Sequence, residues 1–327
     1  MEEEKIELSE QLIKELYVDL RKKVNKWSEI TKQTPQARMG YVGQHLASIV
    51  TGYPGGKSGA RGYDMIIDDG DRNNIQYAEI KTCYRVDQLG KCNVCKSVVS
   101  SLEKECSFCG STNIKRNDDS KWLITMKNEE DLDLTFEPVF YYFVLFEFEE
   151  INNPENSNII ASIWRVKTDA PGFLLCMLDY YFNIRSKSKS QAPFNMWPHM
   201  LKFYLTKPVK IYEAIIYEND KIETKLLNNY KINEDELDNL EKYSNSKNLT
   251  IDVLKNVCNI LKLDTKGKKS KKELLRFLQE RRSKINNSSL ADAISYAMYY
   301  DKIEEHISEM PEHIQERIKE IQAAIIL

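Results

Sequence analysis

Four cysteines within 18 residues constrain the fold of this chain more than any other feature. The stretch "CNVCKSVVSSLEKECSFCG" places Cys92, Cys95, Cys106 and Cys109 in the spacing C-x2-C-x10-C-x2-C. Each C-x2-C pair brings two sulfurs to one side of a tight turn, and four thiolates favour tetrahedral Zn²⁺. Because the protein supplies all four ligands, such a site is structural rather than catalytic. We therefore predict a zinc ribbon over residues 91–116 that braces a segment lacking a core of its own.

The other three cysteines stand alone in apolar surroundings, which predicts small buried hydrophobic residues at Cys83, Cys176 and Cys258. A disulfide framework would spread its cysteines across a short secreted chain, so the cluster favours a metal site in a cytosolic protein. Gly110, directly after the second pair, relaxes the turn there. Iron in the same site, or a redox-active pair, is the alternative to zinc.

The composition is that of a water-soluble protein with a substantial core. The chain has 327 residues, of which 42% are hydrophobic and 30% charged, enough for one large or two modest domains. No apolar run reaches the roughly 18 residues that a membrane span needs. The acidic start "MEEEKIELSE" differs from a secretory signal. We expect a cytoplasmic protein that makes no membrane contact.

Hydrophobic periodicity divides the chain into an α/β part and a helical part. Apolar residues at every fourth position from Leu12 to Val24 predict a first helix, and a second is expected from near Pro35. Strand patterns then predominate, with one buried helix in "GFLLCMLDYYFNI" and a hairpin in "KPVKIYEAIIYENDKIETKLL". We expect an α/β domain over residues 1–230, with a mixed sheet flanked by helices, and an all-helical region over 231–327.

Three charged residues lie on two neighbouring predicted strands. Asp64 falls in strand 62–68, and Glu79 and Lys81 fall in strand 75–86. Residues two apart on a strand face the same side, so Glu79 and Lys81 project together, and Asp64 joins them if the strands pair. Two adjacent carboxylates repel unless a cation lies between them, and Mg²⁺ prefers oxygen ligands. With the lysine orienting a water, this set predicts Mg²⁺-dependent hydrolysis of a phosphodiester.

The alternative is that these are ordinary charges at strand ends, because so short a pattern also occurs by chance. A glycine-rich loop beside the three residues favours a site, since loops at strand ends usually carry function. The helix containing "GYVGQHLAS" leads into that loop. The two charges also interrupt an otherwise apolar or β-branched strand, "IQYAEIKTCYRV".

These residues resemble the PD-(D/E)XK nuclease superfamily over roughly residues 35–165. In that superfamily a helix leads into a strand with the aspartate, and the next strand carries (D/E)-x-K. Asp64 matches the first element, with Tyr63 where proline is typical, and Glu79-Ile80-Lys81 matches the second. With a four-cysteine insert after the second strand, the layout resembles type II restriction endonucleases, including the MamI branch. Some members add an acidic metal ligand from the preceding helix, where this chain has Gln44. The sequence is therefore compatible with either one or two catalytic metal ions.

The C-terminal part carries a concentrated basic segment. From Lys255 to Lys284 there are 11 Lys/Arg against 3 Asp/Glu, in a chain of net charge −3. Leucine-rich stretches predict two short helices around the turn "DTKGKKSKK", and segment 248–282 is similar to the SAP motif, a DNA-binding helix pair. The resemblance implies phosphate contacts by five lysines: Lys266, Lys268, Lys269, Lys271 and Lys272. A solvated pair of surface helices is the alternative.

Two smaller basic segments are candidates for DNA contact. Lys57 and Arg61 lie in the glycine-rich loop next to Asp64, where a phosphate contact is favoured. Lys187 and Lys189 lie in "RSKSKSQ", for which a disordered surface loop is an equal alternative. The glycine-rich loop lacks the G-x4-G-K-[ST] pattern of a nucleotide-binding loop.

The resemblance implies a type II restriction endonuclease that cuts double-stranded DNA, with a cognate DNA methyltransferase encoded nearby. A homodimer is expected, because its two-fold axis then matches the dyad of a symmetric site. The apolar stripe in "MPEHIQERIKEIQAAIIL" is one candidate dimer contact, and packing on its own domain is the alternative. The rival functions are a structure-specific repair or recombination nuclease and a catalytically inactive zinc/SAP DNA-binding protein.

Overall fold

The computed structural model describes most of the chain, and its contacts divide it into two compact units. The described residues are 2–31, 40–56, 63–68, 75–87, 89–99, 105–116, 120–150, 157–188, 192–232, 237, 240–281 and 287–326. The first unit comprises Met1–Trp122, Phe140–Arg165 and Lys210–Tyr230. The second comprises Leu123–Val139, Val166–Val209 and Lys231–Leu327. Because the chain passes repeatedly between the units, independent folding of residues 1–230 and 231–327 stays a prediction.

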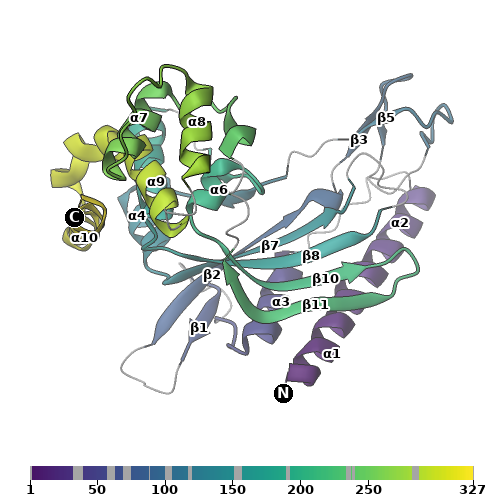
Figure 1. The fold of residues 1–327 in the computed structure, drawn as a ribbon. Helices are drawn as coiled ribbons and strands as arrows, with labels where there is room; N and C mark the ends of the chain where they lie inside the picture. Colours follow the sequence, from purple (N-terminus) through teal and green to yellow (C-terminus); the bar gives the residue numbers. More distant parts are fainter. Residues whose placement is uncertain are drawn as a thin grey trace. The chain divides into compact units, whose positions relative to one another are not determined.

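The first unit is built around a six-stranded sheet in the order β1-β2-β7-β8-β10-β11 (Figure 1). The strands are β1 (Met65–Ile67), β2 (Gln76–Tyr84), β7 (Phe140–Phe148), β8 (Ile159–Lys167), β10 (Val209–Ile216) and β11 (Ile222–Ile232). β1 pairs with β2 antiparallel, whereas β2 pairs with β7 parallel. The predicted α/β architecture with a mixed sheet is therefore confirmed. The strand β7, "FYYFVLFEF", is buried along most of its length, as expected of a strand covered on both faces.

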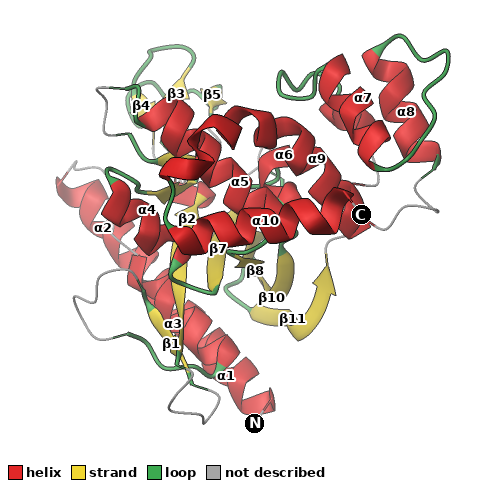
Figure 2. Ribbon diagram, turned by 90° about the vertical axis from the view of Figure 1, so that its left-hand side faces the viewer, coloured by secondary structure: helices red, strands yellow, loops and turns green. Residues whose placement is uncertain are grey.

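A second, three-stranded sheet lies in the first unit, in the order β4-β3-β5 (Figure 2). Its strands are β3 (Gly90–Cys92), β4 (Val98–Val99) and β5 (Ile114–Lys115). They lie between β2 and β7 in the sequence and begin at Gly90, one residue before the predicted ribbon of residues 91–116. We call residues 90–116 the ribbon.

The helices of the first unit pack on β2 and β7. They are α1 (Glu2–Ile13), the π-helical turn η1 (Lys14–Asp19), α2 (Leu20–Thr31) and α3 (Gly40–Thr51). The Tyr17 ring lies 4.4 Å from the Phe146 ring and 5.9 Å from the Tyr84 ring. The helical spacing predicted Leu16 on the buried face, but its side chain is 40% exposed, and Ile13 and Tyr17 are buried instead. The buried residues Ser9, Ile13 and Tyr17 recur every four positions, so the buried face of this helix is offset by one residue from the Leu12–Leu16 stripe.

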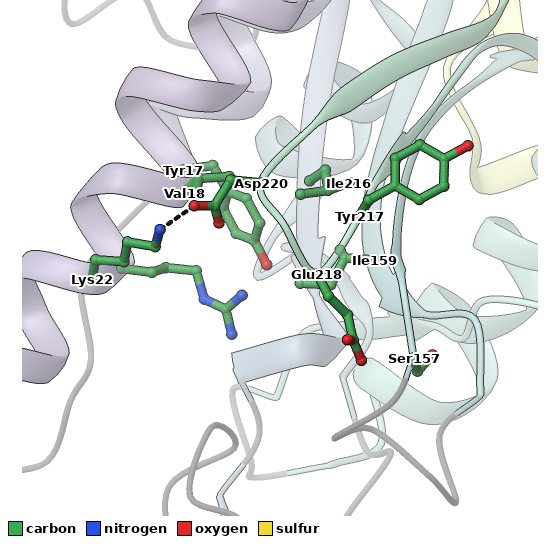
Figure 3. Close-up of a pocket in the computed structure, with 10 residues that line it drawn as sticks. Tyr17, Val18, Lys22, Ser157, Ile159, Ile216, Tyr217, Glu218 and Asp220 are labelled. Carbon is green, nitrogen blue, oxygen red and sulfur yellow. Dashed lines mark hydrogen bonds and ion pairs between the residues drawn. The ribbon is translucent and has the colours of Figure 1, made fainter.

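The π-turn also borders a pocket of about 180 Å³ (Figure 3). An ion pair between Lys22 and Asp220 lies at its edge and joins α2 to the turn after β10. The hydrogen bond from Lys22 lowers the pKa of Asp220 below its usual value. None of the predicted site residues lines this pocket. The Lys22–Asp220 ion pair therefore links the turn between β10 and β11 to α2.

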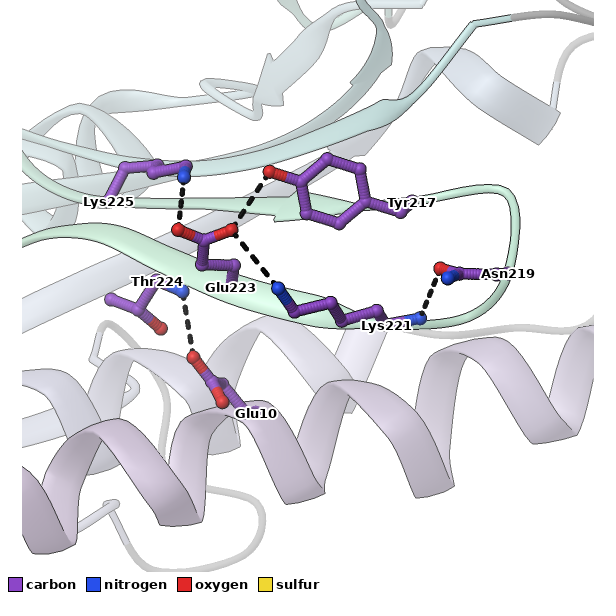
Figure 4. A network of polar contacts seen from close by, with 7 residues as sticks. All are labelled: Glu10, Tyr217, Asn219, Lys221, Glu223, Thr224 and Lys225. Atoms are coloured by element: carbon purple, nitrogen blue, oxygen red, sulfur yellow. Dashed lines mark hydrogen bonds and ion pairs between the residues drawn. The ribbon is translucent and has the colours of Figure 1, made fainter.

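The edge strand β11 is also held through its backbone (Figure 4). The backbone N–H of Thr224 donates to a Glu10 carboxylate oxygen at 2.7 Å. On the same strand, Glu223 accepts from the Tyr217 hydroxyl at 2.9 Å and pairs with Lys225. An edge N–H that is bonded to a carboxylate is unavailable for pairing with a strand of another chain.

A close contact sets the position of α3 on β2. Gly43 of α3 lies against Thr82, and a Cβ atom at residue 43 would overlap the threonine hydroxyl. Thr82 shares its face of β2 with the buried Ile80, since both positions are even-numbered on one strand. Glu79 and Lys81 therefore face away from α3.

We expect Gly43→Ala to destabilise the protein by about 1–3 kcal/mol, the usual cost of overpacking a well-packed contact. Urea denaturation would measure the loss of unfolding free energy. Gly40→Ala is the matched control, because no atom lies within 4 Å of a Cβ at the start of the same helix. Equal stability of the two variants would contradict the close approach.

The second unit contains a two-stranded sheet and most of the helices. The strands are β6 (Trp122–Ile124) and β9 (Phe194–Met196); the helical elements are α4 (Glu129–Phe136), α5 (Pro171–Asp179), the π-turn η4 (Tyr180–Arg185), α6 (Leu201–Leu205), η6 (Leu240–Tyr243), α7 (Ile251–Ile260), α8 (Lys271–Glu280), α9 (Asn287–Ile303), η8 (Glu304–Glu309) and α10 (Glu312–Ile326). The predicted buried helix is confirmed as α5, and the predicted C-terminal helical region is confirmed as well. No helix in the described ranges has the length and apolarity to cross a bilayer.

The apolar stripe of α10 packs on its own chain. Ile314, Ile318 and Ile321 are buried within the second unit. The Arg317 guanidinium also donates to the backbone carbonyl of Phe136 at 3.4 Å. These contacts match the alternative in which the stripe docks on its own domain, so the stripe no longer supports a dimer contact.

Candidate active site and metal centre

The structure brings Asp64 alongside Glu79 and Lys81. Asp64 lies one residue before β1 (Met65–Ile67), whereas the sequence had predicted it inside the strand. Its backbone N–H still bonds to the Ala78 carbonyl of β2 at 2.9 Å. The Oδ2 atom of Asp64 accepts a hydrogen bond of 2.9 Å from the backbone N–H of Ile80. Since Ile80 separates Glu79 from Lys81, this bond places the aspartate beside both.

The second oxygen of Asp64 is held by the preceding helix. The Nε2 atom of Gln44, on α3, donates to Asp64 Oδ1 at 2.7 Å. Residue 44 therefore supplies a neutral amide that orients the aspartate. With one hydrogen bond to each oxygen, the carboxylate has a defined orientation.

Glu79 and Lys81 form an ion pair on the face of β2 that points away from α3. In the parallel pairing with β7, Glu79 lies beside Tyr141 and Lys81 beside Phe143, and both aromatic residues are buried. Burial raises the pKa of Glu79 above its usual value; Lys81 opposes this shift, and the negative charge of Asp64 adds to it. The ionised form of Glu79 is therefore disfavoured at this position.

The residues present fit a hard divalent cation. Both candidate ligands are carboxylates, the ligand type that Mg²⁺ prefers. Lys81 engages Oε1 of Glu79, while Oε2 takes no hydrogen bond from the described part of the chain. Asp64 and Glu79 thus offer oxygen ligands at a place where burial, and in addition the charge of Asp64, raises the pKa of Glu79.

Two tyrosines next to these residues were not predicted as part of the site. The rings of Tyr63 and Tyr77 stack with centroids 4.2 Å apart. Tyr77 lies two residues before Glu79 and so shares its face of β2. A Cβ on Gly56 would lie 3.2 Å from the Tyr63 ring, so the glycine permits this approach. In the sequence, the position of Tyr77 beside the site was signalled only by the alternation of Tyr77, Glu79 and Lys81 along β2.

The four clustered cysteines converge as predicted. Their Sγ atoms all lie within 4.8 Å of one another, with Cys92–Cys109 at 3.6 Å and Cys95–Cys106 at 3.4 Å. A tetrahedron with Zn–S bonds of about 2.3 Å has sulfurs about 3.8 Å apart. The sulfur positions therefore fit a closed four-thiolate metal site, which zinc would fill.

The two cysteine knuckles share one backbone conformation. The N–H of Lys96 donates to the Cys92 carbonyl at 3.0 Å, and that of Gly110 donates to the Cys106 carbonyl at 2.8 Å. Lys96 and Gly110 have φ angles of 66° and 68°. The relaxed turn predicted at Gly110 is confirmed. Lys96 adopts the same left-handed conformation, which is sterically strained for a residue that has a Cβ atom.

The predicted basic helix pair is present as α7 and α8. Ser270 caps α8 and forms a reciprocal capping box with Glu273, which defines the start of this helix. Gly267, with a φ of 83°, forms the turn between the helices. Neither feature tests the SAP assignment or DNA binding.

The five lysines of this segment are not equivalent. Lys266 has a 93% exposed side chain, and Lys269 and Lys272 are exposed as well. Lys268 lies over the Phe277 ring, with Nζ 5.6 Å from the centroid. Lys271 instead donates to the Ser246 carbonyl at 2.7 Å, a contact within the fold.

The remaining candidate DNA contacts are mostly outside the described residues. Lys57, Arg61 and Lys189 fall there. Lys187 is exposed, and its Nζ donates to the Asn183 side chain at 3.1 Å. DNA contact by these four residues stays a prediction.

A family model for the MamI restriction endonuclease matches residues 26–241. The match covers about two thirds of the chain and includes Asp64, Glu79, Lys81 and the four clustered cysteines. It ends before α7, so the basic helix pair lies outside it. No curated protein and no solved structure matches the chain.

Proposed function

Because the chain belongs to the MamI restriction endonuclease family, we propose that it is a type II restriction endonuclease. It hydrolyses phosphodiester bonds of double-stranded DNA at a specific sequence, and it requires Mg²⁺. The observation that carries this assignment is the hydrogen bond from Ile80 to Asp64, which sets one carboxylate beside the Glu79–Lys81 pair.

Asp64 and Glu79 would hold the Mg²⁺ ion. When bound there, the ion would polarise a phosphoryl oxygen and lower the pKa of a water. The hydrogen bonds from Gln44 and Ile80 fix the direction of the Asp64 carboxylate before substrate arrives. A preoriented ligand pair loses less conformational entropy when the cation binds.

Lys81 has two roles in this proposal. Its ammonium pairs with Glu79 and so favours the ionised form that a ligand needs, against the effect of burial. It also places a positive charge beside the scissile phosphate, where charge develops as the bond breaks. A neutral side chain at residue 81 would supply neither effect.

Purified protein and a sequenced plasmid, with and without Mg²⁺, test the proposed function. A discrete set of fragments that requires Mg²⁺ supports restriction. A smear, or preferential cutting of branched DNA, would favour a repair nuclease. Binding without any cleavage would favour the inactive DNA-binding protein.

The exposed lysines of the helix pair are proposed to bind DNA phosphates. The triple variant Lys266→Gln, Lys269→Gln, Lys272→Gln is expected to reduce the slope of log K against log salt by about 0.9 for each phosphate that the variant no longer neutralises. Anisotropy titrations of a labelled duplex at several salt concentrations would measure this slope. An unchanged slope would mean that this turn faces solvent.

Cleavage of both strands at a symmetric site leads us to propose a homodimer on DNA, since the protein dyad then coincides with that of the duplex. Sedimentation of the protein with a cognate duplex distinguishes a dimer from a nicking monomer. A methyltransferase of matching specificity, encoded nearby, would protect the host DNA.

A further inference from the structure

The ribbon sheet has one buried and one exposed face. In its register Lys91 lies opposite Lys115 on one side and Val98 on the other. Side chains directly opposite each other point to the same face, and all three are exposed. The next residue of β3, Cys92, points to the other face, where it is buried with Ile114 packed against it. The exposed face therefore presents two lysines side by side.

This pairing is unfavourable for the isolated fold. Cβ atoms of directly opposed residues lie roughly 4.5–5.5 Å apart, and like charges at that spacing destabilise a sheet. No carboxylate in the described part of the chain forms an ion pair with Lys91 or Lys115. Cys92, the metal ligand on this strand, points to the opposite face. An anion from another molecule would remove the repulsion.

Each cysteine knuckle also exposes a large apolar side chain. Val94 is 63% exposed and Phe108 is 79% exposed, each at the residue before the second cysteine of its pair. Val98, directly opposite Lys91, is 60% exposed as well, so an apolar side chain adjoins the lysines on this face. Lysine is depleted at protein–protein interfaces, whereas the phosphate backbone of DNA attracts it, so the chemistry favours DNA over a protein.

We propose that the ribbon contacts duplex DNA, with Lys91 and Lys115 on the phosphate backbone. This inference rests on the proposed function, because the substrate must be DNA. The ten residues from Lys81 to Lys91 span at most about 36 Å, close to one turn of duplex at about 34 Å. The ribbon contact therefore lies within about one helical turn of the scissile bond, and the ribbon acts on binding as well as on stability.

The decisive variant is Lys115→Glu, which exchanges repulsion for an ion pair across the two strands. Its zinc content should be unchanged and its melting temperature equal or higher. DNA binding should nevertheless weaken, and the salt slope should fall by about 0.9 for each phosphate left without a lysine partner. A labelled 30-base-pair duplex without added divalent cation is the probe, which separates binding from cleavage. A purely structural role would move stability and affinity together.

The double variant Lys91→Gln, Lys115→Gln should show the same reduction in slope. Lys23→Gln, Lys26→Gln on α2 removes equal charge from another exposed surface and should keep the wild-type slope. Wild-type slopes in both ribbon variants would overturn the inference and leave the proposed function intact. Failure of the wild-type protein to bind duplex would overturn both. A change in self-association by sedimentation, with the slope unchanged, would identify a second copy as the partner and refute the DNA contact.

Discussion

Glu79→Gln is expected to reduce DNA cleavage by about 1,000-fold or more and, without divalent cation, to raise the melting temperature. The loss of activity follows from removing one of two carboxylates that would hold Mg²⁺. The gain in stability follows from removing an ionisable group whose charged form is disfavoured by burial. Opposite effects on activity and stability are the signature of a site residue rather than an ordinary surface charge.

The pH dependence gives the sign of the stability effect. The pKa of Glu79 is raised above the usual 4.5, so the folded state holds its proton more tightly than the unfolded state. As pH rises from the unfolded pKa through the folded pKa, the wild type loses stability that the glutamine variant retains. The difference in melting temperature should therefore be present at neutral pH and vanish below the unfolded pKa.

Thermal melts at several pH values and single-turnover cleavage measure the two effects. Glu150→Gln, an exposed glutamate after β7, is the matched control and should change neither. Asp64→Ala and Lys81→Ala should abolish cleavage as well, while duplex binding largely survives because phosphate contacts elsewhere supply most affinity. Full cleavage by Glu79→Gln would refute the assigned site.

Cys106→Ser is expected to unfold the ribbon. The small core of this segment consists of Cys92, Val99 and Cys106 with Ile114 packed against it, so two of its members are metal ligands. Structural zinc contributes on the order of 10–16 kcal/mol to the folding of small metal-bound peptides. Loss of one ligand should therefore release the metal and lower both stability and solubility.

Elemental analysis should find one zinc ion per wild-type chain, retained under mild chelation that strips Mg²⁺. Hydrogen exchange should show reduced protection over residues 90–116 in Cys106→Ser. Val94→Ser changes an exposed residue of the first knuckle that is not a ligand and should keep the metal. A metal-free wild-type protein with full activity would contradict the zinc site.

The sequence alone predicted features that depend on short-range spacing. The C-x2-C pairs define two tight turns, and the structure brings their sulfurs together. Glu79 and Lys81 share a face because residues two apart on any strand do so. The buried helix α5 follows equally from a continuous apolar run. In each case neighbouring residues carry the whole signal.

Only the tertiary structure decided which residues distant in sequence meet. The bond from Gln44 to Asp64 requires α3 to dock on β2, and a helical pattern does not specify its docking partner. The opposition of Lys91 and Lys115 depends on strand register, because a shift of one residue would turn one of them to the buried face. The apolar stripe on α10 is covered by its own chain. Its periodicity showed only that this face must be buried. It could not show against which surface, because the hydrophobic effect depends on the area buried and not on the identity of the partner.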